Sequence, residues 1–506
     1  MARARLAQNG SSIEGLLAAA FALALTWVGS RISDIVPFAP LALAERLIRL
    51  APGDAATWAI DNLGRSASHA LAVGTTLAFM LGGAALPRLT AGRDRPRAHL
   101  AGLAFALALL LASVAAPVGH PVLAATATAG FAGLLYGTSL EWLLEVRAHG
   151  PSGEHDLGRR RALLWLGAWT AGLAVGGWLL GRLLDRAGPD TAVALERPDR
   201  PLPAPPVDDF PVVRGLLPDV TPVADHYVVD IDLVDPVVEA EDWRLEVAGL
   251  VDAPASFGFS DLQRAFVVVE EISVLTCVSN PVGGPLVGNA AWTGVRLGGV
   301  LEAVGVQRGA VDVVFRCADG YDVSIPLERA TEPTTLLAIG QNGRPLTQEH
   351  GFPCRVRVPS LYGMMNAKWL RSIEVVGVDH DGYWAQRGWS PIGEVHTQSR
   401  IDTPAGARAG EPTWIAGVAW AGLRRIARVE VSVDGRRTWS DAQLRRSRSN
   451  AAWTQWAYRW TPERAGTVRI VCRATDGTGR RQEVVERPPH PAGATGYHER
   501  DLRVSA

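Results

Sequence analysis

Cys277 is a candidate metal ligand, because a cysteine thiolate is a soft donor that suits transition metals. It lies in residues 273–280, and two clusters with basic side chains follow it, at residues 350–355 and 366–370. The imidazole, guanidinium and ammonium groups in those clusters are natural partners of a phosphate anion. These residue types suit a cofactor that carries both a metal and a phosphate, provided that the fold brings the three segments together.

Each of these residues also has an ordinary structural explanation when it is taken alone. A single cysteine in a β-rich domain is most often a buried structural thiol. His350 is compatible with a hydrogen-bonded histidine of the core, and Lys368 with the solvated end of a strand. It is their occurrence together that favours the functional interpretation.

The three segments resemble the molybdopterin domain of the sulfite oxidase family. The match includes the Cys-x-x-Asn spacing of Cys277 and the Trp-x-Gly of residues 292–294, and it extends over residues 221–486. The resemblance implies that the Cys277 thiolate binds molybdenum. It also implies that His350, Arg355 and Lys368 hold the phosphate of the pterin.

The resemblance implies further contacts with the molybdenum-molybdopterin cofactor and with the substrate. The additional cofactor-binding residues are Asp225, His226, Tyr227, Asn280, Asp319, Asn366 and Ala367. The family's active-site tyrosine has no counterpart in this shorter chain. The candidates to act in its place, together with Cys277 as the catalytic cysteine, are Tyr362, Tyr383 and Arg387.

The chain departs from the family where sulfite oxidases use arginines to bind sulfite. Those positions hold Ala224, Pro281 and Val282. A doubly charged anion would therefore lose charge-assisted hydrogen bonds that contribute roughly 1.5–3 kcal/mol each. We expect oxygen-atom transfer on a small neutral or singly charged substrate rather than on sulfite itself.

The 506 residues carry nearly balanced charge, so nothing indicates a nucleic-acid partner. The predicted fold class is an α-helical membrane domain, an α+β molybdopterin domain and an all-β immunoglobulin-like sandwich. The predicted divisions are a membrane anchor (1–185), a Pro-rich linker (186–218), the molybdopterin domain (219–390), the dimerisation domain (391–487) and a C-terminal tail (488–506). By the resemblance, the third domain makes a possible homodimer.

Five apolar runs approach the length that crosses a bilayer as a helix. They are residues 12–29, 69–87, 100–117, 121–140 and 162–184. Residues 35–50 are instead predicted to form an amphipathic helix at the membrane interface. Arginines concentrate before the first run and in the second and fourth loops, which predicts a cytoplasmic N-terminus and an extracytoplasmic catalytic domain in the cell membrane.

Arg159 and Arg160 precede the last run and have two explanations. They resemble a twin-arginine export signal, and they equally satisfy the positive-inside rule. Four cysteines are present, and we expect Cys317, Cys354 and Cys472 to be buried free thiols.

The reaction needs an external electron partner, such as a cytochrome or a membrane quinone system. His69 and His120 are candidate ligands of a b-type haem, or ordinary histidines at the ends of membrane helices.

The sequence thus predicts a membrane-anchored molybdopterin-dependent oxidoreductase. One alternative is a catalytically inactive scaffold on the same fold, which the missing arginines favour. A second is a reductase of oxidised protein side chains, which differs only in its substrate and electron direction.

Overall fold

The computed structural model describes residues 2–33, 35–52, 55, 58–59, 63, 66–90, 97–114, 121–148, 155–186, 193–205, 207–231 and 234–506. The chain divides into two compact units. The first contains Met1–Ala51, Leu63–Asp190 and Ile231–Leu233. The second contains Pro52–Asn62, Thr191–Asp230 and Val234–Ala506.

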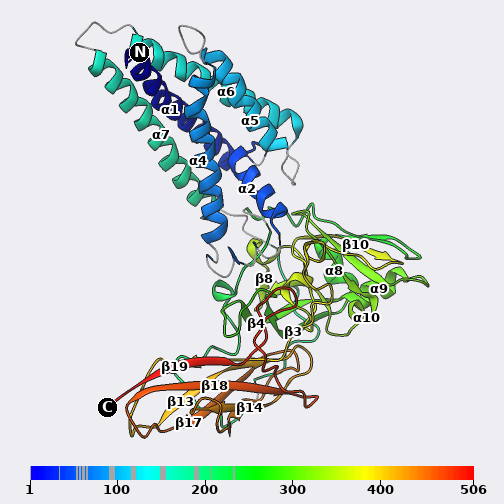
Figure 1. The fold of residues 1–506 in the computed structure, drawn as a ribbon. Coiled ribbons are helices and arrows are strands. Elements are labelled where there is room, and N and C mark those ends of the chain that lie inside the picture. The colour runs from blue at the N-terminus through cyan, green and yellow to red at the C-terminus, as the bar shows by residue number, and fades with distance from the viewer. Residues whose placement is uncertain are drawn as a thin grey trace. The chain divides into compact units, whose positions relative to one another are not determined.

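The first unit is helical (Figure 1). Its described helices are α1 (Ala2–Ile32), α2 (Ala39–Leu50), α4 (Ser66–Leu89), α5 (Ala98–Val114), α6 (Val122–Ala148) and α7 (His155–Arg186). Four segments in the described residues are long and apolar enough to cross a membrane: Ser12–Ile32, Ser66–Leu89, Val122–Val146 and Arg160–Leu180.

The third predicted span, residues 100–117, is shorter in the structure than the four segments above. It corresponds to α5, which has 17 residues and falls among the shorter apolar helices. At 1.5 Å per residue it is roughly 25 Å long, against about 30 Å for the hydrocarbon core of a bilayer. The predicted end of this run, residues 115–117, lies outside the described residues, as does His120.

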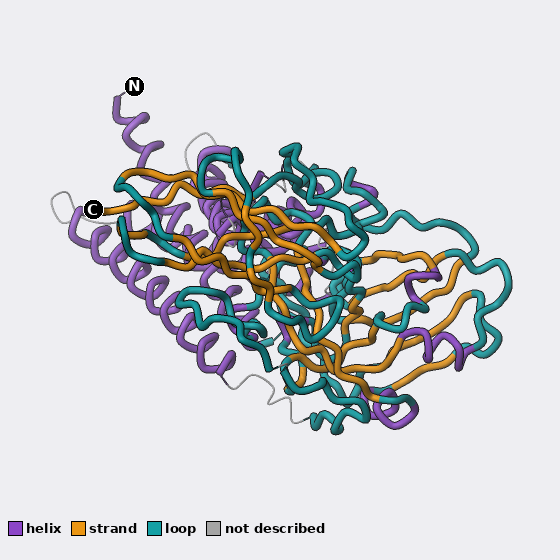
Figure 2. The backbone as a smooth tube through the Cα atoms, turned by 90° about the horizontal axis from the view of Figure 1, so that it is seen from below, coloured by secondary structure: helices purple, strands orange, loops and turns teal. Residues whose placement is uncertain are grey.

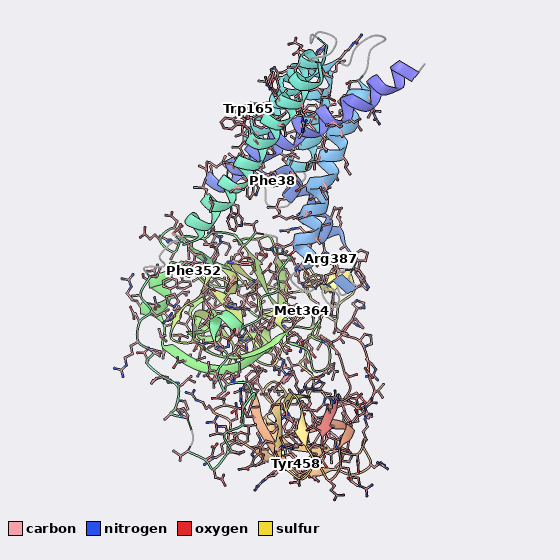
Figure 3. All side chains as sticks on the ribbon, turned by 90° about the vertical axis from the view of Figure 1, so that its left-hand side faces the viewer. Phe38, Trp165, Phe352, Met364, Arg387 and Tyr458 are labelled. Carbon is pink, nitrogen blue, oxygen red and sulfur yellow. The ribbon has the colours of Figure 1, made fainter. Side chains whose placement is uncertain are left out.

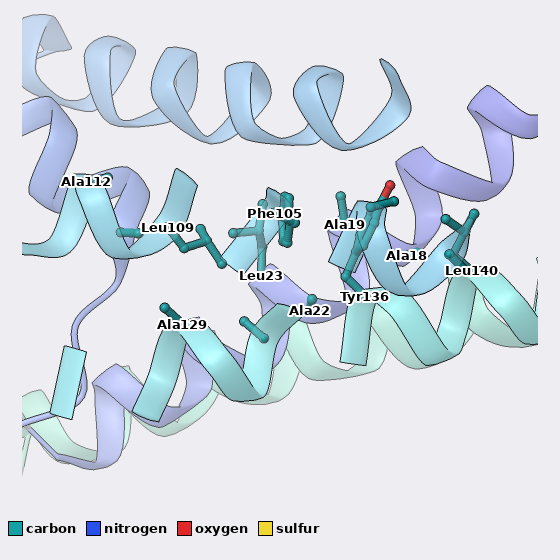
Figure 4. Close-up of a cluster of buried hydrophobic side chains, with 14 residues drawn as sticks. Ala18, Ala19, Ala22, Leu23, Phe105, Leu109, Ala112, Ala129, Tyr136 and Leu140 are labelled. Carbon is teal, nitrogen blue, oxygen red and sulfur yellow. The ribbon is translucent and has the colours of Figure 1, made fainter. Parts of the chain in front are cut away.

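Small residues allow the helices of this unit to approach closely, as is usual in membrane helix bundles. A methyl group on Gly102 of α5 would lie 2.6 Å from the carbonyl oxygen of Gly133 in α6. The Tyr136 hydroxyl of α6 donates to the Gly83 carbonyl of α4 at 2.6 Å. Figure 4 shows Phe105 and Tyr136 within the same buried apolar cluster, where their rings stack at 4.6 Å.

α2 has the one-sided burial expected of an amphipathic helix. Pro40 at its start fixes a backbone angle suited to the first turn. Ala42 and Ala44 are buried, whereas Arg46 and Leu47 are exposed. The structure therefore agrees with the amphipathic pattern, over a slightly shorter segment than residues 35–50.

The second unit begins with an α+β region that contains two sheets. One has the strand order β3-β4-β7-β8, with β9 also paired to β7, and the other β2-β1-β10-β5-β6. The strands are β1 (Leu245–Gly249), β2 (Ala255–Phe257), β3 (Val268–Thr276), β4 (Val287–Arg296), β5 (Asp312–Cys317), β6 (Asp322–Pro326), β7 (Leu336–Gln341), β8 (Arg344–Pro345), β9 (Arg355–Arg357) and β10 (Leu370–Val376). β3 and β4 are buried along most of their length, so they form the centre of this region.

Helices and turns connect these strands. The helices are α8 (Phe259–Ala265), α9 (Leu297–Val304) and α10 (Leu327–Ala330). Short 3-10 turns carry several of the candidate residues: η1 (Val223–Asp225), η2 (Gln348–His350), η3 (Gly363–Met365) and η4 (Ala385–Arg387). Figure 2 shows that loops rather than long helices join the strands of this unit.

The C-terminal region contains two further sheets, β11-β13-β17-β16 and β12-β19-β18-β14-β15. The strands are β11 (Gln398–Thr403), β12 (Ala407–Arg408), β13 (Thr413–Trp420), β14 (Ile426–Ser432), β15 (Ser440–Asp441), β16 (Gln443–Leu444), β17 (Thr454–Trp460), β18 (Gly466–Asp476) and β19 (His498–Ser505). Ile415 and Trp456 of one sheet and Val429 and Ile470 of the other belong to one apolar core.

Two segments outside these strands differ from their predicted descriptions. Residues 488–506 were expected to form a tail, but β19 lies there and pairs with β18, because Leu502 and Val504 alternate with polar residues and are buried. The predicted Pro-rich spacer is largely without regular structure, yet it is attached to the second unit. Arg200 forms a parallel bridge with Val269 of β3.

Candidate active site

Cys277 follows β3 directly and is buried, with 8% of its surface exposed. Its backbone N–H donates to the Leu286 carbonyl at 3.0 Å, and its carbonyl accepts from the Asn280 N–H at 3.1 Å. The Asn280 Oδ1 accepts from the Leu286 N–H at 2.9 Å. The Cys277 Sγ lies 3.0 Å from the Ser279 Oγ. The loop is thus closed by its own hydrogen bonds, and it places the thiol beside a hydroxyl group.

The C-terminal region also contacts the loop that follows Cys277. A methyl group on Gly283 would lie 2.2 Å from Cδ2 of His498, so the imidazole packs directly on this glycine. The Arg400 guanidinium donates to the Gly284 carbonyl at 2.8 Å and pairs with Asp402 at 2.8 Å. Two β-rich regions therefore determine the position of the loop.

Tyr227 and the turn around Gly363 lie against Cys277. A methyl group on Gly363 would be 2.7 Å from the Tyr227 Oη and 3.7 Å from the Cys277 Cα. Burial raises the pKa of Tyr227 and of Tyr362 above the usual value, and the nearby Cys277 adds to both shifts. The Tyr362 Oη accepts from the His396 N–H at 3.3 Å. Both phenols are therefore neutral at physiological pH and close to the thiol.

Two buried histidines extend the site away from Cys277. The rings of His226 and Tyr227 stack at 5.5 Å, and the His226 ring meets His350 edge-on at 5.5 Å. Burial, aided by nearby His350 and Arg355, lowers the pKa of His226 to about 3. His226 is therefore a neutral imidazole at physiological pH.

Arg355 joins His350 to the turn that contains Asn366. Its guanidinium donates to the His350 carbonyl at 3.0 Å and to the Asn366 carbonyl at 3.2 Å. Burial lowers the pKa of Arg355 to about 10, so the group remains protonated at neutral pH. The next residue of the turn, Ala367, is buried and its carbonyl accepts from the Val356 N–H at 2.8 Å.

Lys368 is mostly buried and already has partners in the protein. Its Nζ donates to the Asp230 carboxylate at 2.8 Å and to the Glu349 carbonyl at 2.9 Å. It also lies 4.1 Å from the centre of the Trp369 ring. An ammonium has three N–H donors, so one remains for another acceptor. The ion pair with Asp230 was not predicted, since the two residues are far apart in sequence.

The turn that contains Asp319 lies next to the bend with Lys368 and Trp369 that precedes β10. The Ala318 N–H donates to the Trp369 carbonyl at 2.9 Å, and the buried Asp319 Oδ1 accepts from the Tyr321 N–H at 3.0 Å. Burial raises the pKa of Cys317, with the Asp319 carboxylate adding to the shift and Lys368 opposing it. Asp319, Cys317 and Lys368 therefore share one neighbourhood.

Three predicted residues lie farther from the thiol. Asp225 is exposed at the end of η1. Tyr383 contacts Tyr321 at 5.6 Å between ring centres, and the Arg387 guanidinium lies 3.6 Å above the Tyr383 ring. The Tyr321 hydroxyl in turn donates to the Met364 carbonyl at 2.6 Å; Figure 3 labels Met364 and Arg387. Tyr383 and Arg387 thus group with Tyr321.

Arg357 is a buried cation that the sequence analysis did not single out. It is 1% exposed and lies on the same strand as Arg355, two residues later. Alternate residues of a strand point to one face, and both guanidinium groups lie over Trp292, at 5.3 Å for Arg355 and 5.1 Å for Arg357. The available signal was a pair of alternating arginines in an otherwise apolar strand.

Several buried polar atoms around Trp292 have no hydrogen-bond partner among the described residues. They are the Nε2 of His226, the Nε of Arg355, the Nε of Arg357 and both amide atoms of Gln341, which pairs with Trp292 in the sheet. Buried polar groups are normally hydrogen-bonded, so unsatisfied groups gathered in one place call for an explanation. A polar, anionic molecule would fit the guanidinium donors of this set.

The comparisons with known proteins agree with this chemistry. Residues 232–384 match the oxidoreductase molybdopterin binding domain, and residues 390–484 match the Mo-co oxidoreductase dimerisation domain. The chain is 38% identical to the uncharacterized oxidoreductase YuiH of Bacillus subtilis over 159 residues, which cover 31% of this chain and 78% of YuiH.

The chain is also similar to a sulfite oxidase and to a solved structure of a sulfane dehydrogenase. The chain is 33% identical to the sulfite oxidase of Gallus gallus over 294 residues, covering 48% of this chain and 64% of that enzyme, somewhat less than two thirds of its length. The sulfane dehydrogenase SoxCD from Paracoccus pantotrophus shares 25% identity and a TM-score of 0.48, covering 53% of this chain and 76% of that chain.

The domain matches and the similarity to YuiH agree with the thiol, the buried cations and the unsatisfied donors described above. The family implies a molybdenum-molybdopterin cofactor and an oxidoreductase activity. The chain belongs to the sulfite oxidase family of molybdopterin-dependent oxidoreductases.

Proposed function

We propose that this oxidoreductase is anchored in the cell membrane and transfers an oxygen atom to or from a small substrate other than sulfite. The observation that carries the proposal is the series of neighbours that runs from Cys277 by way of Gly363 to Tyr227, and from there through His226 to His350 and Arg355. When bound, the cofactor supplies oxygen-atom transfer coupled to a two-electron change at molybdenum.

The residues have separate roles in this proposal. Cys277 provides the thiolate ligand of the metal, and His350, Arg355 and Lys368 hold the phosphate. Lys368 keeps its ion pair with Asp230 and uses its remaining N–H for the anion. The remaining cofactor contacts are assigned to Asp225, His226, Tyr227, Asn280, Asp319, Asn366 and Ala367.

Among the catalytic candidates, Tyr362 is favoured over Tyr383 and Arg387. It is adjacent to Gly363, whose Cα lies close to Cys277, and its phenol is buried. Tyr383 and Arg387 instead contact each other and Tyr321. We assign Tyr362 to positioning the substrate through its hydroxyl.

The charges around the Cys277 loop support a neutral or singly charged substrate. Pro281 and Val282 stand where sulfite oxidases have arginines. The nearest cation of the C-terminal region, Arg400, is already paired with Asp402. Burial and the nearby arginines Arg500 and Arg400 lower the pKa of His498 to about 4, so this imidazole adds no charge at neutral pH. A doubly charged anion would therefore lack charge-assisted hydrogen bonds here.

The membrane topology depends on α5. If all five apolar helices cross the bilayer, the cytoplasmic N-terminus puts the catalytic domain on the extracytoplasmic face. If α5 does not cross, the catalytic domain lies on the same side as the N-terminus. The close packing of Gly102 against Gly133 supports α5 as a full partner of α6. C-terminal fusions to alkaline phosphatase and to a fluorescent protein distinguish the two topologies.

The remaining assignments concern domains and partners. We propose the divisions 1–185, 186–218, 219–390 and 391–487, with the C-terminal sheets forming an immunoglobulin-like sandwich that makes a homodimer. The dimerisation domain match at residues 390–484 supports this assembly. The electron partner is a cytochrome or a membrane quinone system, and analytical ultracentrifugation of the purified chain tests the dimer.

Metal and pterin analysis of the purified full-length protein tests the proposal against the inactive scaffold. We expect stoichiometric molybdenum and pterin, and we expect Cys277→Ser to reduce activity to background. A wild-type protein without molybdenum would favour the scaffold. A panel of sulfoxides, N-oxides and sulfite, assayed with an artificial electron carrier, then determines substrate charge and electron direction. Sulfite as the best substrate would contradict the substrate assignment.

A further inference from the structure

Arg357 is held by neutral groups on three sides. Its guanidinium donates to Asn366 Oδ1, to the Ser273 Oγ at 2.7 Å and to the Val274 carbonyl at 3.0 Å. Ser273 and Val274 belong to β3, the strand that ends directly before Cys277. Asn366 lies two residues before Lys368. Arg357 thus connects the strand of the proposed metal ligand to the turn of the proposed phosphate ligand.

The positive charge of Arg357 has no carboxylate partner within the part of the chain that the structure describes. Among the ion pairs of the described residues, none includes Arg355 or Arg357, although both side chains are buried and share the Trp292 ring. Burial, reinforced by the neighbouring Arg355, lowers the pKa of Arg357 to about 9, which leaves it protonated at neutral pH. Two adjacent buried cations are unfavourable unless an anion compensates them.

We propose that Arg357 is a cofactor-retaining residue: its fixed charge, next to that of Arg355, is neutralised by the anionic molybdopterin and stabilises the cofactor in its pocket. This inference depends on the proposed function, and it adds a cation that the family resemblance did not assign. The two terminal nitrogens of Arg357 already donate to protein groups, and its Nε has no partner among the described residues. We therefore assign Arg357 to act through its charge and by positioning, with the Nε–H left for an acceptor of the cofactor.

Two consequences distinguish a charge from a purely structural role. A nearby positive charge favours the reduced, more negative state of a metal centre, so its removal lowers the midpoint potential. The same charge destabilises the cofactor-free protein, because there it is buried without an anion. Removal of the charge should therefore decrease the thermal stabilisation that the cofactor provides.

The experiment uses the full-length protein in detergent and compares Arg357→Met, Arg357→Lys and Ser273→Ala with wild type. Molybdenum per folded protein, the midpoint potential from an EPR-monitored titration and the melting temperature with and without cofactor are measured. We expect Arg357→Met to retain molybdenum roughly tenfold less well, since it loses one charge-assisted interaction, and to have a lower potential. Arg357→Lys and Ser273→Ala keep the charge, so their molybdenum content and midpoint potential should stay close to those of the wild type.

Each other outcome contradicts the inference. An Arg357→Met protein with full molybdenum and an unchanged potential would show that the charge is dispensable. If Arg357→Lys behaves like Arg357→Met, hydrogen bonding rather than charge explains the effect. If Arg357→Met does not fold, a tenfold loss of molybdenum in Arg357→Lys would still overturn the inference, and its retention would support it. Wild-type protein without molybdenum instead overturns the proposed function itself.

Discussion

The buried arginines of the C-terminal region and those of the molybdopterin domain differ in how their charge is balanced. In the C-terminal region three buried or half-buried guanidinium groups pair with carboxylates: Arg473 with Glu430 at 2.8 and 2.9 Å, Arg400 with Asp402 at 2.8 Å, and Arg424 with Asp476 at 2.9 Å. In the molybdopterin domain, Arg355 and Arg357 donate only to neutral oxygens within the described residues.

We interpret this difference as one between arginines that stabilise the fold and arginines whose charge an anionic ligand would balance. The charge of a buried cation that pairs with a carboxylate is neutralised within the folded protein. A buried cation without one leaves a free-energy deficit that an anionic ligand can remove. We therefore expect such unbalanced charge to mark a pocket for an anionic ligand, and this expectation does not depend on the sequence motifs. The following experiments test this contrast.

The largest effect is expected for Arg355→Met, which removes the cation that joins His350 to the Asn366 turn. The phosphate would lose a charge-assisted partner and the turn two hydrogen bonds, so most of the molybdenum and the activity should be lost. Molybdenum analysis and activity, both normalised to folded protein, measure this effect. A variant that keeps its molybdenum and its activity would contradict the assignment of Arg355 to the cofactor site.

Arg473→Met should instead destabilise the fold without affecting the cofactor. Glu430, 4% exposed, would be left as a buried carboxylate without its bidentate partner. Breaking a buried pair in this way costs about 3–5 kcal/mol, which denaturant unfolding measures. Loss of molybdenum from the protein that remains folded would contradict the proposed separation of the two regions.

The stability of the cofactor-free protein should decrease as the pH falls below 6.5. The folded-state pKa of His226 is about 3, so between these values the unfolded chain binds a proton that the folded chain does not. Each pKa unit corresponds to about 1.36 kcal/mol, so the total effect is on the order of a few kcal/mol.

Melting temperatures between pH 7 and pH 4 measure this acid sensitivity, and His226→Gln should reduce it. The bound cofactor should also reduce it, because an anion next to the imidazole favours the protonated form. Equal acid sensitivity with and without cofactor would place His226 outside the electrostatic reach of the cofactor.

The smallest effect is expected for Arg469→Met, a matched control for Arg473→Met on the same strand. Arg469 also binds a carboxylate with two nitrogens, at 2.9 and 3.0 Å to Asp501, but the two side chains are 57% and 53% exposed. Exposed ion pairs contribute little to stability, because water and salt screen the two charges. A loss comparable to that of Arg473→Met would show that burial does not explain the contrast.

The periodicity and composition of the chain predicted much of the fold. Runs of about 20 apolar residues predicted the long helices of the first unit. The expectation that Cys317, Cys354 and Cys472 are buried free thiols is confirmed. The third predicted span corresponds to α5, whose 17 described residues place it among the shorter apolar helices. β19 was missed because a short polar-apolar alternation resembles a tail.

The candidate site was predicted less completely. Motif spacing selected Cys277, His350 and Arg355, and the structure brings them into one series of neighbours. It did not select Arg357, whose role depends on Trp292 and Ser273, two residues of other strands. Nor did it reveal the ion pair of Lys368 with Asp230, because no local pattern connects positions so distant in the chain.

From its sequence alone, this chain could be assigned its chemistry: a thiol, a group of cations, and the missing arginines that argue against sulfite. These are properties of residue types and local spacing, which need no coordinates. Only the tertiary structure decided which cations have carboxylate partners, since Arg473 meets Glu430 across two strands whereas Arg355 and Arg357 meet only Trp292 and neutral oxygens. Electrostatic balance depends on distance and burial, and both exist only after the chain has folded.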